Sequence, residues 1–157
     1  SIQDKSMKFG REKMYKYHDG IFQMFEDTFS CGMNYVCSRS FLSELCYTEL
    51  GFKDYSFRTH ANALMSTVDY LTQFYNVYFV LLNVDEKDME DRLKRDKFQY
   101  VTHSVENAIQ QQNMYQSIFR RYAKEDSDIG FFEIENKDLQ ATVNAIKDII
   151  LTGMIGE

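Results

Sequence analysis

MNYVCSRSFLSELCY, residues 33–47, decides the fold that we expect for this chain of 157 residues. Its first part predicts a short apolar strand over residues 34–38, and Ser40 then caps a helix over residues 40–50. Arg39 lies at the turn between them. Open α/β sheets bind ligands at such turns, and a planar guanidinium there suits a phosphate. Free backbone N–H groups at the helix start would face the same anion.

The other segments alternate between helical and strand patterns. VYFVLLNV, residues 77–84, is a near-continuous apolar run, typical of a parallel strand covered on both faces. Asp85 is expected to cap the next helix and Asn136 the last one. Apolar spacings predict helices over 10–30, 59–74 (Ala63, Leu64, Val68 and Leu71 inward), 104–124 and 138–151, a loop over 51–57 and a strand over 131–134. This order predicts an α/β fold, a parallel sheet flanked by helices, in a single domain over residues 1–157.

The composition narrows the function classes. A net charge of −6 speaks against general nucleic-acid binding, which needs a basic face, but leaves room for a local basic cleft. No apolar run approaches the length of a membrane span, so we expect a cytoplasmic protein with no membrane partner. Cys31, Cys37 and Cys46 lack the spacing of metal ligands. We expect reduced thiols, with Cys37 in the core, and no metal site.

SRSFLSELCY resembles the Asp-Arg-x-x-x-Ser-x-x-x-Tyr element of thymidylate kinase-like P-loop kinases. Two later segments extend the resemblance: VYFVLLNVDEKDMEDRLKRD is similar to the family's strand, short helix and arginine-bearing lid, and FFEIENKDLQATVNAIKDII to its last strand and helix. The resemblance implies that Arg39 binds the phosphate of the acceptor nucleotide. It also places Ser43 and Tyr47 where the family has its serine and tyrosine. Ser38 stands where the family has an aspartate that helps to organise magnesium.

Further candidate residues flank this element. Glu44 follows Arg39 on the first helical turn, where it would bond a nucleoside hydroxyl or base, or else face solvent. Arg92 and Arg95 share a helix face, and the resemblance makes them catalytic lid arginines in a lid-like segment of about 92–104. The alternative is a solvated helix end, where the dipole favours cations. The three histidines are isolated in the sequence and give nucleophilic catalysis little support.

The sequence contains no G-x-x-x-x-G-K-[ST] loop, with which the family's fold begins. Either that part was lost in evolution or this sequence is a fragment of a longer polypeptide. In a complete form, the resemblance implies phosphorylation of a nucleoside monophosphate by ATP with Mg²⁺, whereas the chain alone should be inactive. The alternative is a catalytically inactive kinase-fold binding or interaction protein. In either case we expect the uncovered sheet to find a partner, as a homodimer or with the protein's own amino-terminal piece.

Overall fold

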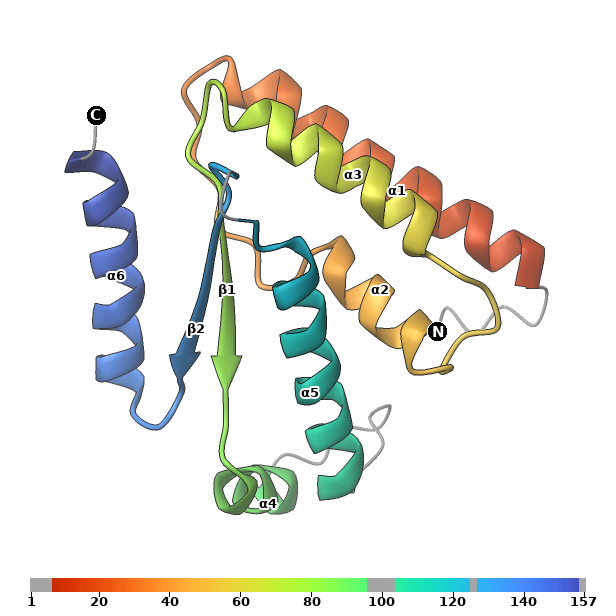
Figure 1. The fold of residues 1–157 in the computed structure, drawn as a ribbon, viewed down its shortest axis with the longest axis vertical. Helices are drawn as coiled ribbons and strands as arrows, with labels where there is room; N and C mark the ends of the chain where they lie inside the picture. The colour runs from red at the N-terminus through yellow and green to blue at the C-terminus, as the bar shows by residue number, and fades with distance from the viewer. Residues whose placement is uncertain (1–6, 96–103, 125–126, 156–157) are drawn as a thin grey trace. The chain divides into compact units, whose positions relative to one another are not determined.

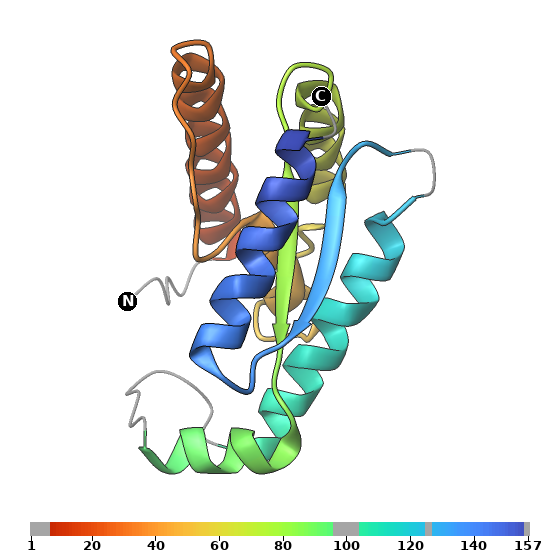
Figure 2. The same ribbon diagram turned by 90° about the vertical axis from the view of Figure 1, so that its left-hand side faces the viewer.

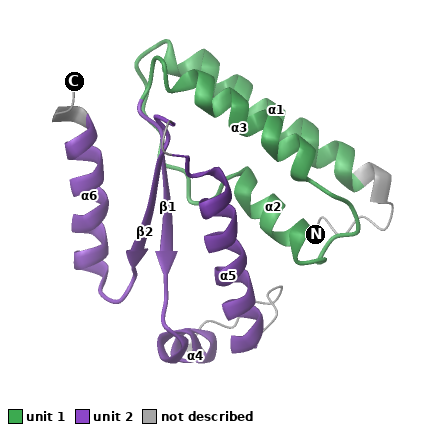
Figure 3. Ribbon diagram, viewed as in Figure 1, with its two compact units in different colours: residues 1–75 green, residues 76–157 purple. Residues whose placement is uncertain are grey.

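The computed structural model describes residues 7–95, 104–124 and 127–155. Within them, three helices come first along the chain, and two strands separated by two helices and followed by a last helix come after (Figures 1 and 2). The elements are α1 (Met7–Phe29), α2 (Phe41–Glu49), α3 (Arg58–Leu71), β1 (Tyr78–Asn83), α4 (Glu86–Arg95), α5 (Val105–Tyr122), β2 (Gly130–Glu135) and α6 (Leu139–Ile155). The chain forms two compact units (Figure 3): unit 1 covers residues 1–75 and unit 2 covers residues 76–157. The prediction of a single domain stays a prediction.

Unit 1 consists of the helices α1, α2 and α3. Helices α1 and α3 run in the same direction: Tyr15 of α1 stacks on His60 in the first turn of α3, with ring centroids 4.1 Å apart, and Phe29 at the end of α1 contacts Tyr75, which follows α3. Helix α2 packs against α3. The buried apolar side chains of this unit include Phe22, Phe41, Leu42, Leu45, Cys46, Phe57, Ala61, Leu64, Met65, Val68 and Leu71. These residues recur at spacings of three and four, which explains why the segments fold as helices.

Both ends of α2 follow from the local sequence. The Ser40 side chain accepts a hydrogen bond from the Leu42 N–H, so the predicted N-cap is confirmed. At the other end Gly51 has a φ of +74°, which a residue with a Cβ rarely adopts. The Phe52 N–H donates to the Tyr47 carbonyl, and the two rings lie 6.1 Å apart. This hydrogen bond and ring contact form a Schellman motif, which ends the helix where the sequence predicts.

Several predictions in unit 1 are wrong. Residues 34–38 form no strand: Val36 is 93% exposed and Cys37 lies at the surface rather than in the core. A strand needs a neighbour for its backbone hydrogen bonds, and within the described residues only β1 and β2 pair with each other. In α3, Ala63 is exposed and Ala61 takes its inward place, because Ala61 lies three residues before Leu64 on the buried face.

Unit 2 is a two-stranded parallel sheet with a helix on each face, which confirms the α/β class. Strands β1 and β2 pair in register from Tyr78 opposite Gly130 to Asn83 opposite Glu135. Helix α5 contacts β1 and α6 contacts β2, and Figure 1 shows them on opposite faces of the sheet, with α4 beyond the carboxyl end of β1. On the α5 face Phe119 meets Phe131, which stacks on Phe79.

The sheet is less covered than the apolar run predicts. Leu82 and Phe132 remain exposed although a helix lies on each face. Within the described residues β1 has a strand neighbour on one edge only, so side chains near the open edge lack adjacent packing. The last helix begins differently from the prediction: Asp138 accepts from the Ala141 N–H and is the cap, and Asn136 instead accepts from the Thr142 hydroxyl. No helix in the described ranges is long and apolar enough to cross a membrane.

Candidate functional site

The predicted phosphate site in unit 1 lies at the start of α2. Arg39 is exposed, and within the described residues no hydrogen bond or ion pair holds its guanidinium. The first N–H groups of the helix are already occupied, because the Leu42 N–H donates to the Ser40 hydroxyl and the Ser43 N–H donates to the Ser40 carbonyl. An anion bound here would therefore depend mainly on Arg39, rather than on free backbone donors as the sequence predicts.

Ser43 and Tyr47 follow Arg39 at intervals of four residues, so α2 places them along one face. Both side chains are half-buried, and the Tyr47 ring packs on Phe52 in the motif that ends the helix. Ser43 and Tyr47 therefore share one face of α2, whereas Arg39 precedes the helix and no contact in the described chain joins it to them.

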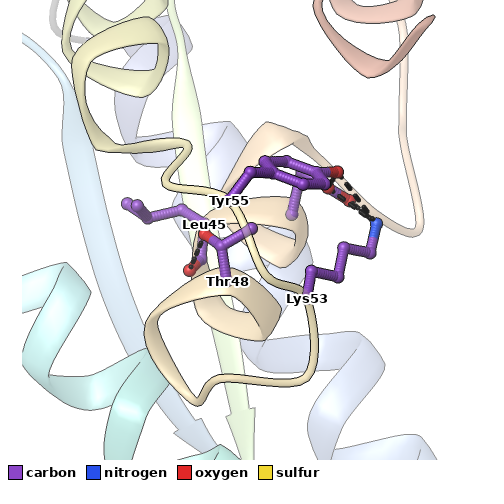
Figure 4. Close-up of polar contacts among 5 residues, drawn as sticks. Leu45, Thr48, Lys53 and Tyr55 are labelled. Atoms are coloured by element: carbon purple, nitrogen blue, oxygen red, sulfur yellow. Dashed lines mark hydrogen bonds and ion pairs between the residues drawn. The ribbon is translucent and has the colours of Figure 1, made fainter. Parts of the chain in front are cut away.

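Glu44 occupies a different environment from either of those expected. Its side chain is only 5% exposed, and Lys53 Nζ lies 2.6 Å from both carboxylate oxygens. Figure 4 shows the Lys53 side chain directed toward the hydroxyl end of Tyr55. The Tyr55 hydroxyl also donates to this carboxylate. Burial, together with the hydrogen bond to Glu44, raises the pKa of Tyr55 above its usual value, so the phenol stays protonated. The carboxylate that could bond a nucleoside is thus already engaged by two donors.

Two histidines lie close to this cluster. His18 is 6% exposed, and its Nε2 has no hydrogen-bond partner among the described residues. Burial lowers the pKa of His18, against an opposing effect of the Glu44 charge, so the ring is neutral at pH 7. His60 Nε2 lies 2.9 Å from Asp19 Oδ1, but it makes no hydrogen bond within the described residues.

The sequence did not predict this cluster of Glu44, Lys53, Tyr55 and His18. His18 lies four residues before the buried Phe22 on α1, and this spacing is the one signal that could have revealed it. Lys53 and Tyr55 come from the loop after α2, where no periodicity marks them. Cys46, in the same unit, is chemically inert, because burial raises the pKa of its thiol to about 12.

Unit 2 gathers polar side chains at the carboxyl edge of its sheet. The Gln112 amide bridges both backbone groups of Val84: the Val84 N–H donates to Oε1 at 2.8 Å, and Nε2 donates to the Val84 carbonyl at 3.1 Å. Asn83, itself buried, donates to Glu133 at 2.8 Å and accepts from Gln116 at 3.4 Å. This edge is where open α/β sheets bind ligands, and here it is tied together by neutral amides and one carboxylate.

Arg92, predicted as a lid arginine, lies half-buried on α4. Its Nη2 donates to the backbone carbonyl of Asn136, 2.7 Å away, and so ties α4 to the loop after β2. The side chain of Arg95 and residues 96–103 of the predicted lid lie outside the described residues. Of the two predicted lid arginines, only the side chain of Arg92 is described, and it lies at the carboxyl edge of the sheet.

The described surface has shallow, open hollows, and two of them can be compared with the predicted site residues. One, of about 310 Å³, is lined by Thr48, Glu49, Lys53, Asp54, Tyr55 and Ser56. The other, of about 360 Å³, is lined by Glu90, Leu93, Lys94 and Val105. Neither includes Arg39 or Arg92, and within the described residues no group of three metal-ligating side chains comes together.

Comparison with protein-family models, curated proteins and solved structures finds no match. The resemblance to thymidylate kinase-like kinases thus remains a prediction from the sequence.

Proposed function

We propose that this chain is the acceptor-binding and lid-bearing part of a nucleotide kinase-like protein that phosphorylates nucleoside monophosphates. The observation that carries the proposal is the exposed Arg39 directly before the Ser40-capped helix, on which Ser43 and Tyr47 share one face. A guanidinium that no neighbour in the described chain neutralises is available to a phosphate, as the thymidylate kinase pattern requires. The complete protein would need ATP, Mg²⁺ and a phosphate-binding loop that this sequence does not contain.

Unit 2 supports the same proposal through its topology. A parallel strand is followed at its carboxyl end by α4, and Arg92 lies beside the loop after the neighbouring strand. Cations at this edge suit the donor phosphates. The remaining N–H groups of Arg92 would serve that purpose, with the bond to Asn136 fixing the guanidinium.

A second candidate function is a kinase-fold protein that binds without transferring phosphate. Ser38 offers a neutral hydroxyl where the family pattern has a carboxylate, and the Glu44 carboxylate is occupied by Lys53 and Tyr55. These observations favour binding without turnover.

Calorimetric titration of Arg39→Ala tests the acceptor site. We expect affinity for a nucleoside monophosphate to fall about ten- to a hundredfold, while affinity for the bare nucleoside stays nearly constant. Arg11→Ala, an exposed arginine on α1, is the matched control and should change neither affinity. Equal loss for both ligands, or none for either, would contradict the proposed role.

A coupled kinase assay on the same preparation separates the two candidates. We expect residues 1–157 to transfer no phosphate by themselves, since donor binding in this family depends on the absent loop. Addition of a segment bearing a phosphate-binding loop should restore turnover if the enzyme proposal is right. Nucleotide binding that never leads to turnover would favour the second candidate.

A further inference from the structure

One end of unit 1 carries a continuous aromatic surface, which we call the aromatic end. It consists of Phe29, Met33, Tyr35, Tyr70, Phe74 and Tyr75. Ring contacts connect its members from α3 to α1, since Tyr70 meets Phe74, Phe74 meets Tyr75 and Tyr75 meets Phe29, with centroid distances of 5.1–6.3 Å. Phe29 also meets Tyr35, whose hydroxyl lies 4.0 Å from the Met33 sulfur. The surface is therefore one patch rather than scattered side chains.

The aromatic end is well exposed. Phe74 is 63% exposed and Tyr70 58%, and Met33 and Tyr35 also reach the surface. Single exposed apolar residues need no explanation, but a contiguous group of rings and a methionine is typical of an interaction site. Aromatic residues and methionine are also the residue types enriched in the buried centres of protein interfaces.

The charged residues in the two helix ends that lead into the aromatic end are negative. Glu26 and Asp27 lie in the last turn of α1, and Asp69 in the last turn of α3. Neither last turn contains a basic residue, and residues 17–38 and 59–76 contain no lysine or arginine at all.

The helix dipoles add to this field. Helices α1 and α3 run in the same direction, and the contact between Phe29 and Tyr75 brings their carboxyl ends together. Each carboxyl end carries a partial negative charge that favours cations. An arginine would gain further from the exposed ring faces by cation–π contact.

We propose that the aromatic end docks a basic peptide segment of a partner protein, with an apolar anchor on the rings of Tyr70 and Phe74 and arginine or lysine beside Glu26 and Asp27. Charge complementarity selects this occupant, because an acidic or neutral segment would leave the negative rim and both helix ends uncompensated. The proposal does not depend on Arg39 or on phosphoryl transfer.

Selection from a displayed library of short random peptides, with the full chain as bait, tests the proposal. We expect enriched sequences to combine arginine or lysine with aromatic or aliphatic residues. In fluorescence polarisation with the synthetic peptides, the double variant Tyr70→Ser/Phe74→Ser should weaken binding at least about tenfold. The charge variant Glu26→Gln/Asp27→Asn should weaken it less and reduce its dependence on salt.

The control replaces exposed apolar residues elsewhere. Leu139→Ser/Leu151→Ser on α6 removes a comparable apolar surface from unit 2 and should leave the affinity within about twofold of the wild type. Circular dichroism would verify that each variant remains folded. The proposal would be overturned if no peptides were enriched, if the enriched peptides were acidic, or if their affinity did not change in the Tyr70→Ser/Phe74→Ser variant. A dimer that the same changes dissociate would assign the surface to a second copy and would also overturn it.

Discussion

The two units bury polar groups in opposite ways. Unit 1 encloses an ion pair, Glu44 with Lys53, and leaves the buried His18 without a hydrogen bond at Nε2. Unit 2 secures the edge of its sheet mainly with the neutral amides of Asn83 and Gln112. A buried charge that loses its partner keeps its full desolvation penalty, whereas the loss of the Gln112 amide leaves only the neutral backbone groups of Val84 unsatisfied. Unit 1 should therefore respond more strongly to substitution and should also respond to pH.

The largest effect is expected from Lys53→Met, which removes the cation beside Glu44. Breaking a buried ion pair on one side costs roughly 3–5 kcal/mol, and the partial exposure of Lys53 places this pair near the lower end of that range. Urea unfolding followed by circular dichroism would measure the loss. Hydrogen exchange with mass spectrometry should locate it in peptides of unit 1.

Two further variants sharpen this test. Lys16→Met removes an exposed lysine from α1 and should change stability by less than about 0.5 kcal/mol. The double variant Lys53→Met/Glu44→Gln should recover much of the loss, since a glutamine can still accept from Tyr55 without carrying a charge. If Lys53→Met were as mild as Lys16→Met, the cluster would not be the buried ion pair described above.

In both units, the features that the sequence predicts depend on local signals, and those that it misses depend on contacts between distant segments. Helix α2 was predictable at both ends because its signals, Ser40 and Gly51, act within a few residues. The strand pair of unit 2 was predictable from apolar runs. Residues 34–38 have a strand-like composition but no pairing neighbour in the described chain, and a single segment cannot reveal whether its partner exists. The Glu44 cluster depends on Lys53, a loop residue that only the folded chain places beside Glu44. The one sequence signal for the cluster was therefore the spacing of four residues between His18 and the buried Phe22.

The second prediction concerns the close approach of α6 to the sheet. A Cβ at Gly153 would overlap the hydroxyl of Tyr78, so Gly153→Ala should destabilise unit 2 by about 1–3 kcal/mol. Gly20 lies within α1, where nothing approaches within 4 Å, so Gly20→Ala should instead stabilise unit 1 by up to about 1 kcal/mol. Thermal unfolding of both variants measures these opposite signs. If both variants changed the unfolding temperature in the same direction, the close packing of Tyr78 on α6 would be contradicted.

The third prediction tests whether neutral amides stabilise the edge of the sheet. Gln112→Met keeps the side-chain length but removes both hydrogen bonds to Val84, at a cost of about 1–2 kcal/mol. Asn113→Met, at the exposed neighbouring position, is the control and should be nearly neutral. Amide exchange at Val84 should accelerate in the first variant only. An unchanged exchange rate of the Val84 amide would mean that Gln112 does not hydrogen-bond the backbone at the end of β1.

The smallest effect is the pH dependence that His18 gives to unit 1. Burial lowers the pKa of His18 in the folded protein below the ordinary value of 6.5, so the unfolded chain binds more protons as the solution becomes acidic. The stability contributed by the neutral ring is therefore complete above pH 6.5 and declines as the pH falls through that value. Between pH 7.5 and 6.0 one such proton accounts for at most about 0.8 kcal/mol.

Urea midpoints at these two pH values, for wild type and His18→Gln, would measure the effect. The groups that face His18 are Glu44 from α2, Lys53 from the loop, His60 from α3 and Asp19 from α1. His60→Gln is the matched control because it removes a neighbouring imidazole but leaves His18 in place. We expect His18→Gln to flatten the pH dependence and His60→Gln to preserve most of it. If stability instead rose on acidification, the Glu44 charge would outweigh burial. His18 would then be a protonated, cationic partner of Glu44 rather than a buried neutral ring.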